Sequence, residues 1–188
     1  MTELIHGVIL AGGDSSRMGT NKSLVIFKKK IMIKHVYERL SPQVDKVWVN
    51  SNVFLEQFPK AQQFRDELNP HTGPLVGIYT GLRSAQTEWV QFCPTDTPLL
   101  PLNLVEKLFK KTKNTSSTII VPMVNGQIEP VFSLCHKSTL EGLKAFIFSK
   151  KKKIADWIEK NDFETVVFDN PDEFNNINNK KDLQKIES

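Results

Sequence analysis

The sequence predicts an α/β fold in which a three-layer, mostly parallel sheet is flanked by helices. Three observations support this. Strand-like and helix-like segments alternate along the chain, which is typical of parallel βαβ units. A glycine-rich loop directly follows the first buried strand, and other strands also end in polar residues. Ligands of open parallel sheets bind beyond the carboxyl ends of the strands, so these polar ends are the candidate site.

Short apolar runs predict the strands, and longer amphipathic segments predict the helices. The clearest helix follows a turn-rich stretch at 69–74, because the apolar residues of Leu75–Ala85 recur at helical spacing. In chain order we expect strand Leu4–Ala11, loop Gly12–Thr20, helix Ile33–Leu40, strand Lys46–Asn50, helix Leu75–Ala85, strand Trp89–Cys93, helix Leu102–Lys111, strand Thr118–Val121, strand Val131–Leu134, helices Leu140–Phe148 and Ile154–Lys160, strand Phe163–Phe168 and helix Lys180–Ile186.

Length and composition favour one domain spanning residues 1–188. The chain is 39% hydrophobic and 24% charged, values that are ordinary for a globular protein with a sizeable core. No apolar run has the roughly 18 residues that a membrane span needs, and the N-terminus lacks the layout of a signal peptide. The two cysteines, Cys93 and Cys135, form no CxxC pair and lie in apolar runs, which favours core packing and a cytoplasmic location.

The net charge of +4 is concentrated in three lysine blocks, at 28–30, 110–111 and 150–153. Such blocks are usually solvated faces, although clustered positive charge also attracts polyanionic ligands. No aromatic residues are interleaved with the lysines in a nucleic-acid-binding pattern, so we expect no nucleic-acid partner. A basic RNA-associated protein remains the alternative.

The loop after the first strand has the residue types of a phosphate site. Its glycine pair, Gly12 and Gly13, lets backbone N–H groups approach phosphates, while Arg17 and Lys22 supply positive charge. The spacing fits neither GxxxxGK[ST] nor GxGxxG. A glycine-rich strand-to-helix turn with surface charges is the alternative.

Asp96 follows another predicted strand, within CPTDTP. An aspartate there is often a turn or capping residue. At the same sheet edge as a phosphate loop, its carboxylate instead predicts a Mg²⁺ ligand, because Mg²⁺ prefers one or two carboxylates together with phosphate oxygens and water.

The loop sequence LAGGDSSRMGTNK resembles the signature of nucleotidyltransferases that join a nucleoside triphosphate to a small acceptor. Together with VNSN, RDELNPHTGPLVG, FCPTDTPLLP, EPVFSL and FNNINNKKDL, it is most similar to the molybdenum cofactor guanylyltransferases. The resemblance implies a Rossmann-like sheet of the nucleotide-diphospho-sugar transferase type. It also implies Mg²⁺-dependent transfer of GMP from GTP to molybdopterin, with release of pyrophosphate, and it leaves room for cofactor-delivering or acceptor proteins as partners.

The resemblance also implies a role for each matching residue. Arg17, Lys22 and Asp96 are the expected catalytic residues, and Asp96 also the metal ligand. The residues expected to contact GTP are Leu10, Ala11, Gly12, Gly13, Lys22, Asn50, Asp66 and Asp96, and those expected on the acceptor side are Asn176 and Asn178.

The match has departures and rivals. Thr95 replaces a common cysteine, and Glu129 replaces a common histidine before the Pro-Val-Phe sequence, which leaves acceptor contacts open. Transfer of CMP to molybdopterin or to another phosphorylated acceptor is the alternative within the class. A non-catalytic nucleotide-binding protein is the alternative outside it.

Overall fold

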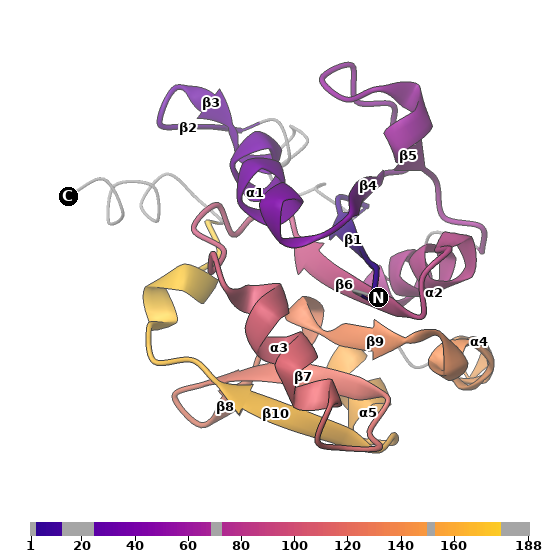
Figure 1. Ribbon diagram of the computed structural model, residues 1–188. Helices are drawn as coiled ribbons and strands as arrows, with labels where there is room; N and C mark the ends of the chain where they lie inside the picture. The colour runs from indigo at the N-terminus through magenta and orange to yellow at the C-terminus, as the bar shows by residue number, and fades with distance from the viewer. Residues whose placement is uncertain (1–2, 13–24, 69–72, 150–152, 178–188) are drawn as a thin grey trace.

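The computed structural model describes residues 3–12, 25–68, 73–149 and 153–177, and these contain one large sheet and a small hairpin (Figure 1). The strands of the sheet are β1 (Ile5–Leu10), β4 (Lys46–Asn50), β5 (Gln63–Phe64), β6 (Trp89–Pro94), β7 (Ile119–Val124), β8 (Gln127–Ile128), β9 (Leu134–His136) and β10 (Phe163–Val167). The hairpin consists of β2 (Ile26–Phe27) and β3 (Lys30–Ile31).

The large sheet has the order β10-β7-β9-β6-β1-β4-β5, and β8 pairs with β7 outside this path. Its centre is parallel, because β1 pairs in parallel with β4 on one side and with β6 on the other. All six residues of β1 are buried. A continuous apolar run is what a parallel strand covered on both faces requires.

Helices cover both faces of the sheet, which confirms the three-layer α/β prediction. The helices are α1 (Met32–Leu40), α2 (Pro74–Ser84), α3 (Leu104–Thr112), α4 (Leu140–Phe148) and α5 (Ile154–Ile158). One buried cluster joins α1 and α3 to side chains such as Ile9 and Ile120. A second joins α2, α4 and α5 to the opposite side chains of the same strands, including Val8 and Val121.

The predicted strand Val131–Leu134 is wrong. Residues Pro130–Phe132 form the 3-10 turn η5, in which the N–H of Phe132 donates to the carbonyl of Glu129 at 3.1 Å. Pro130 has no N–H to give to a strand ladder, so the strand begins only at Leu134. That strand, β9, is antiparallel to both of its neighbours, β6 and β7, and interrupts an otherwise parallel order.

The remaining differences from the predicted elements are small. Helix α5 ends at Ile158, two residues before the predicted end, and α3 begins two residues later than predicted. Strands β2, β3, β5 and β8 were not predicted, since two residues carry no periodicity. The predicted helix Lys180–Ile186 and most of the loop Gly12–Thr20 lie outside the described residues.

Both cysteines are packed in the core, as predicted. Cys93 in β6 and Cys135 in β9 are free and have no exposed surface. Burial raises the pKa of the Cys135 thiol to about 12 and holds the pKa of Cys93 well above its ordinary value. Among the helices of the described segments, none is long and apolar enough to cross a membrane.

His6 makes the fold sensitive to acid. It is 6% exposed in β1, its ring packs on Trp48 with centroids 5.2 Å apart, and burial together with Lys46 lowers its pKa below 6.5. Just below pH 6.5, His6 is therefore still neutral in the folded protein, whereas it binds a proton in the unfolded chain. We expect the free energy of unfolding to fall as pH drops below 6.5, by at most about 1.4 kcal/mol per pH unit from this residue.

Urea unfolding between pH 5 and pH 8 measures this effect. The variant His6→Phe should lose less stability over that range than the wild type does. An identical pH dependence in the two proteins would contradict the assignment to His6.

Candidate active site

The three central strands bring several predicted site residues to one edge of the sheet. Leu10, the last residue of β1, is in register with Asn50 at the end of β4 and with Pro94 at the end of β6. The N–H of Ala11 donates to the carbonyl of Asn50 at 2.8 Å, which fixes the start of the glycine loop against β4. The backbone of Gly12 and the turn containing Asp96 therefore leave the sheet at the same edge.

The side-chain amides of Asn50, which is buried, and of Asn52, which was not predicted as a site residue, hold Asp66 beside the start of this loop. Asn50 Nδ2 donates to Asp66 Oδ1 at 2.9 Å, and Asn52 Nδ2 donates to Asp66 Oδ2 at 2.8 Å. The backbone N–H of Asp66 donates a hydrogen bond to Asn52 Oδ1 at 3.1 Å. Neutral amides thus fix both carboxylate oxygens in position. Asn52 was missed from the sequence, although it lies two residues after Asn50 in the VNSN segment.

Two glycines allow the backbone to approach this amide–carboxylate cluster. A Cβ at Gly12 would lie 3.4 Å from Asn50 Oδ1 and 3.6 Å from Asp66 Oδ2, so the loop passes in contact with the cluster. A Cβ at Gly77 would lie 2.4 Å from Asn50 Oδ1, closer than any real contact allows. Helix α2 can cover Asn50 only because residue 77 has no side chain.

Asp96 is joined to the end of the described chain. It follows β6, is partly buried, and its carbonyl accepts a hydrogen bond from the N–H of Ile177 at 2.8 Å. The hydroxyl of Thr97 donates to Asn176 Oδ1 at 2.8 Å. Ile177 is buried in a small cluster with Phe27 and Met32. The structure therefore places Asn176, expected on the acceptor side, next to the turn that carries Asp96.

Four predicted site residues, Gly13, Arg17, Lys22 and Asn178, lie outside the described residues. Their roles stay predictions from the sequence. The described ones, Leu10, Ala11, Gly12, Asn50, Asp66, Asp96 and Asn176, all lie at or beside the carboxyl edge of β1, β4, β5 and β6.

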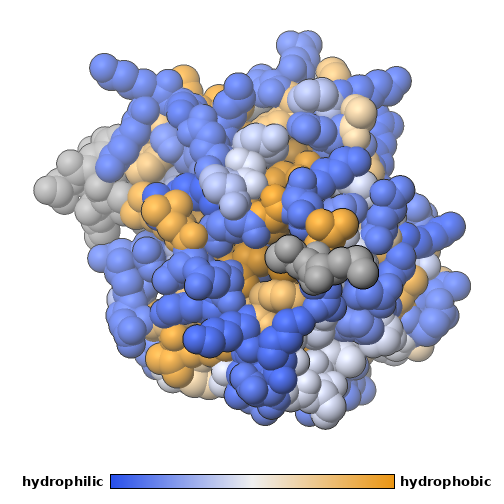
Figure 2. Space-filling view, in the orientation of Figure 1, coloured by the Kyte–Doolittle hydropathy of each residue, from blue (hydrophilic) through white to orange (hydrophobic). Residues whose placement is uncertain are grey.

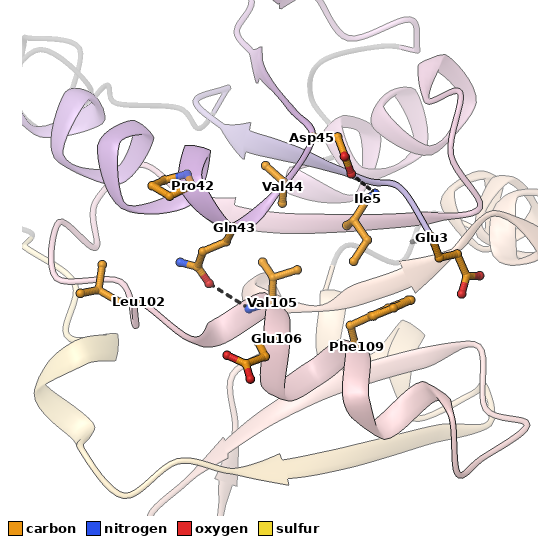
Figure 3. Close-up of a pocket in the computed structure, with 10 residues that line it drawn as sticks. All are labelled: Glu3, Ile5, Pro42, Gln43, Val44, Asp45, Leu102, Val105, Glu106 and Phe109. Carbon is orange, nitrogen blue, oxygen red and sulfur yellow. Dashed lines mark hydrogen bonds between the residues drawn. The ribbon is translucent and has the colours of Figure 1, made fainter. Parts of the chain in front are cut away.

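A cavity of about 470 Å³ opens at the opposite edge of the sheet, beside the amino ends of β1 and β4 (Figure 3). The charged residues that line this cavity, Glu3, Asp45 and Glu106, are all acidic, so they would repel a triphosphate.

Figure 2 shows the molecule in the same orientation as Figure 1, with apolar residues at the centre of the viewed face and hydrophilic residues around them. The cavity contains none of the predicted site residues, so we do not assign it to the nucleotide.

The close contact at Gly77 predicts a large cost for the smallest substitution. Gly77→Ala should lower the free energy of unfolding by roughly 1–3 kcal/mol, because the new methyl group must displace Asn50 or Leu10. Gly142→Ala in α4 is the matched control, since a Cβ there meets nothing within 4 Å. It should stabilise the protein by about 0.5–1 kcal/mol through helix propensity.

Chemical denaturation of the two variants beside the wild type measures both effects. Equal stability of the two variants would contradict the contact between residue 77 and Asn50.

Comparison with known proteins identifies the family and agrees with the observed fold. The model of the MobA-like NTP transferase domain matches residues 7–166. The chain is 37% identical to a molybdenum cofactor guanylyltransferase from Vibrio parahaemolyticus, over 95% of this chain and 93% of the relative. It is 34% identical to one from Haemophilus influenzae, over 98% of each protein.

Two solved structures have the same fold. The molybdopterin-guanine dinucleotide biosynthesis protein A from Archaeoglobus fulgidus superposes with a TM-score of 0.80 at 23% identity, covering 96% of this chain and 95% of the other. A 2-C-methyl-D-erythritol 4-phosphate cytidylyltransferase from Francisella tularensis superposes with a TM-score of 0.74 at 13% identity, covering 98% and 99%. The family model and the nearly full-length relatives together show that this chain belongs to the molybdenum cofactor guanylyltransferase family.

Proposed function

We propose that the protein transfers GMP from GTP to molybdopterin, releases pyrophosphate and so forms the guanine dinucleotide form of the molybdenum cofactor. The observation that carries this proposal is the convergence of Gly12, the Asn50–Asp66 pair and Asp96 at one sheet edge. The relatives named molybdenum cofactor guanylyltransferase support GTP and molybdopterin as the substrates.

Asp66 would position the nucleotide. Each of its carboxylate oxygens accepts one hydrogen bond from an amide, and an ionised carboxylate has about four lone-pair sites. Acceptor capacity therefore remains for N–H or O–H groups of a nucleotide. Because Asn50 and Asn52 already fix the carboxylate, little side-chain entropy is lost when the ligand binds.

The triphosphate would lie along the loop that begins at Ala11 and Gly12. We assign Arg17 and Lys22 to its charge, as the signature sequence implies, and backbone N–H groups to its oxygens. The Asp96 carboxylate fits a Mg²⁺ ligand, since it lies at the same edge and such an ion takes its other ligands from phosphate and water. Bound there, Mg²⁺ would neutralise charge on the phosphates during transfer.

In the transfer itself, an oxygen of the molybdopterin phosphate attacks the α-phosphorus of GTP. The bond from that phosphorus to the bridging oxygen breaks, and pyrophosphate leaves with the electron pair. A phosphate monoester is mostly ionised near neutral pH, so no strong general base is required. The residues of the chain then act by positioning and by stabilising charge.

Transfer of CMP is the second candidate, because the same edge would serve either nucleotide. The names of the relatives favour guanine. Proteins that deliver molybdopterin or accept the product are the further partners that this function implies.

The proposal is tested by a transfer assay that contains the purified protein, GTP, Mg²⁺ and molybdopterin. The wild type should form the dinucleotide product and pyrophosphate, and calorimetry should show tighter binding of GTP than of CTP. Asp96→Asn should lower kcat by roughly 100-fold, in the range of losing one charge-stabilising group. Asp162→Asn, an exposed substitution before β10, is the control and should leave kcat unchanged.

Product formed from CTP in preference to GTP would assign the cytidylyl reaction instead. Absence of transfer with either nucleotide would sink the proposal.

A further inference from the structure

A third carboxyl group, that of Glu129, lies at the carboxyl edge of the sheet, in addition to those of Asp66 and Asp96, and has no role in the reaction described above. Its backbone is fixed on both sides: the N–H donates to the carbonyl of Pro122 at 2.9 Å, and the carbonyl accepts from the N–H of Phe132 at 3.1 Å. These bonds extend the β7–β8 hairpin and lead into η5. The position of Glu129 is therefore set by the sheet.

The side chain of Glu129 is half-buried, and none of the described residues donates a hydrogen bond to its carboxylate or forms an ion pair with it. Burial raises the pKa of this carboxyl above its ordinary value. A half-buried carboxylate that no described residue pairs loses part of its hydration, which costs free energy. A ligand that donates N–H groups would recover this cost.

Glu129 lies on the opposite flank of Asp96 from Asp66. In the sheet, β1, β4 and β5 carry Gly12, Asn50 and Asp66 on one side of β6, whereas β9 and β7 lie on the other side. The η5 turn that follows Glu129 contacts β6, where the N–H of Phe92 donates to the carbonyl of Ser133 at 3.0 Å.

The same flank holds the expected acceptor residue. The Phe132 ring packs edge-on against Phe174 with centroids 5.0 Å apart. Two residues beyond Phe174, Asn176 accepts the hydrogen bond of Thr97, beside Asp96. The packing of Phe132 on Phe174 thus joins the segments of Glu129 and Asn176. They lie on the side of Asp96 away from the amide–carboxylate cluster around Asp66.

We propose that Glu129 binds the pterin ring of the acceptor, by accepting hydrogen bonds from its 2-amino group and the adjacent ring N–H. This inference rests on the proposed function, which supplies molybdopterin as the acceptor. A carboxylate matches that pair of donors in a bidentate arrangement, as it matches a guanidinium. Its negative charge repels the phosphate at the other end of the acceptor, which favours the orientation that directs the phosphate away from Glu129.

Guanine presents the same pair of donors, so the experiment must separate the two rings. Binding of pterin is compared with binding of lumazine, in which a carbonyl replaces the 2-amino group, by titrating each compound and following its fluorescence. The wild type should bind pterin about tenfold or more tightly than lumazine, in the range of a hydrogen bond to a charged group. Glu129→Gln should weaken pterin binding by a similar factor and abolish the preference.

Two further variants separate a direct contact from a structural effect. Glu129→Asp keeps the charge and should retain a preference for pterin. Glu106→Gln, an exposed change at the opposite edge of the sheet, should bind both rings as the wild type does. In the transfer assay, Glu129→Gln should raise KM for molybdopterin about tenfold while GTP affinity, measured by calorimetry, stays unchanged.

Three results would overturn the inference: no preference of the wild type for pterin, an unchanged preference in Glu129→Gln, or a loss of GTP affinity in that variant, which would assign Glu129 to guanine. The ring titration involves no transfer, whereas the proposed function depends on transfer by the wild type. The two therefore fail separately.

Discussion

Strand β1 is hydrogen-bonded in parallel to β4 and to β6, and the register of these two pairings positions the described site. Because Leu10 lies opposite both Asn50 and Pro94, the three strands end at the same level. The start of the glycine loop at Ala11 and Gly12, the amide of Asn50 that holds Asp66 and the turn of Asp96 therefore lie at the same edge of the sheet. A slip of one residue in either pairing would move each side chain to the other face of the sheet, where it meets the other buried cluster, so the packing of the two clusters fixes the register.

The site divides at β6 into two flanks with different construction. On one flank, the carboxylate of Asp66 is held by two amides and touched by a loop glycine. On the other, aromatic packing joins η5 to the segment after β10, and that segment reaches the turn of Asp96 through Thr97 and Ile177. In the proposed reaction, the α-phosphate of GTP and the phosphate of molybdopterin must meet between the guanine ring and the pterin ring, which are bound separately. A sheet with one carboxyl group on each flank of Asp96 suits this requirement.

Most of the fold was predictable because its signals are local. The apolar run of β1 and the helical spacing of α2 specify those elements, and the glycine loop and Asp96 were recognisable from short motifs. The direction of β9 was not predictable, since alternation is the same in parallel and antiparallel strands. The contact between Thr97 and Asn176 spans 79 residues, and no spacing rule reaches so far. Asn52 was missed because one asparagine in a turn resembles another, and only the fold shows that its amide meets Asp66.

The two buried thiols have a practical consequence. Attack on an oxidant or an alkylating reagent requires an exposed thiolate, and neither Cys93 nor Cys135 offers one. The sequence has no other cysteine. The folded protein should therefore tolerate air without a reducing agent. A single cysteine introduced on the surface would carry a spectroscopic label with little background from the natural pair.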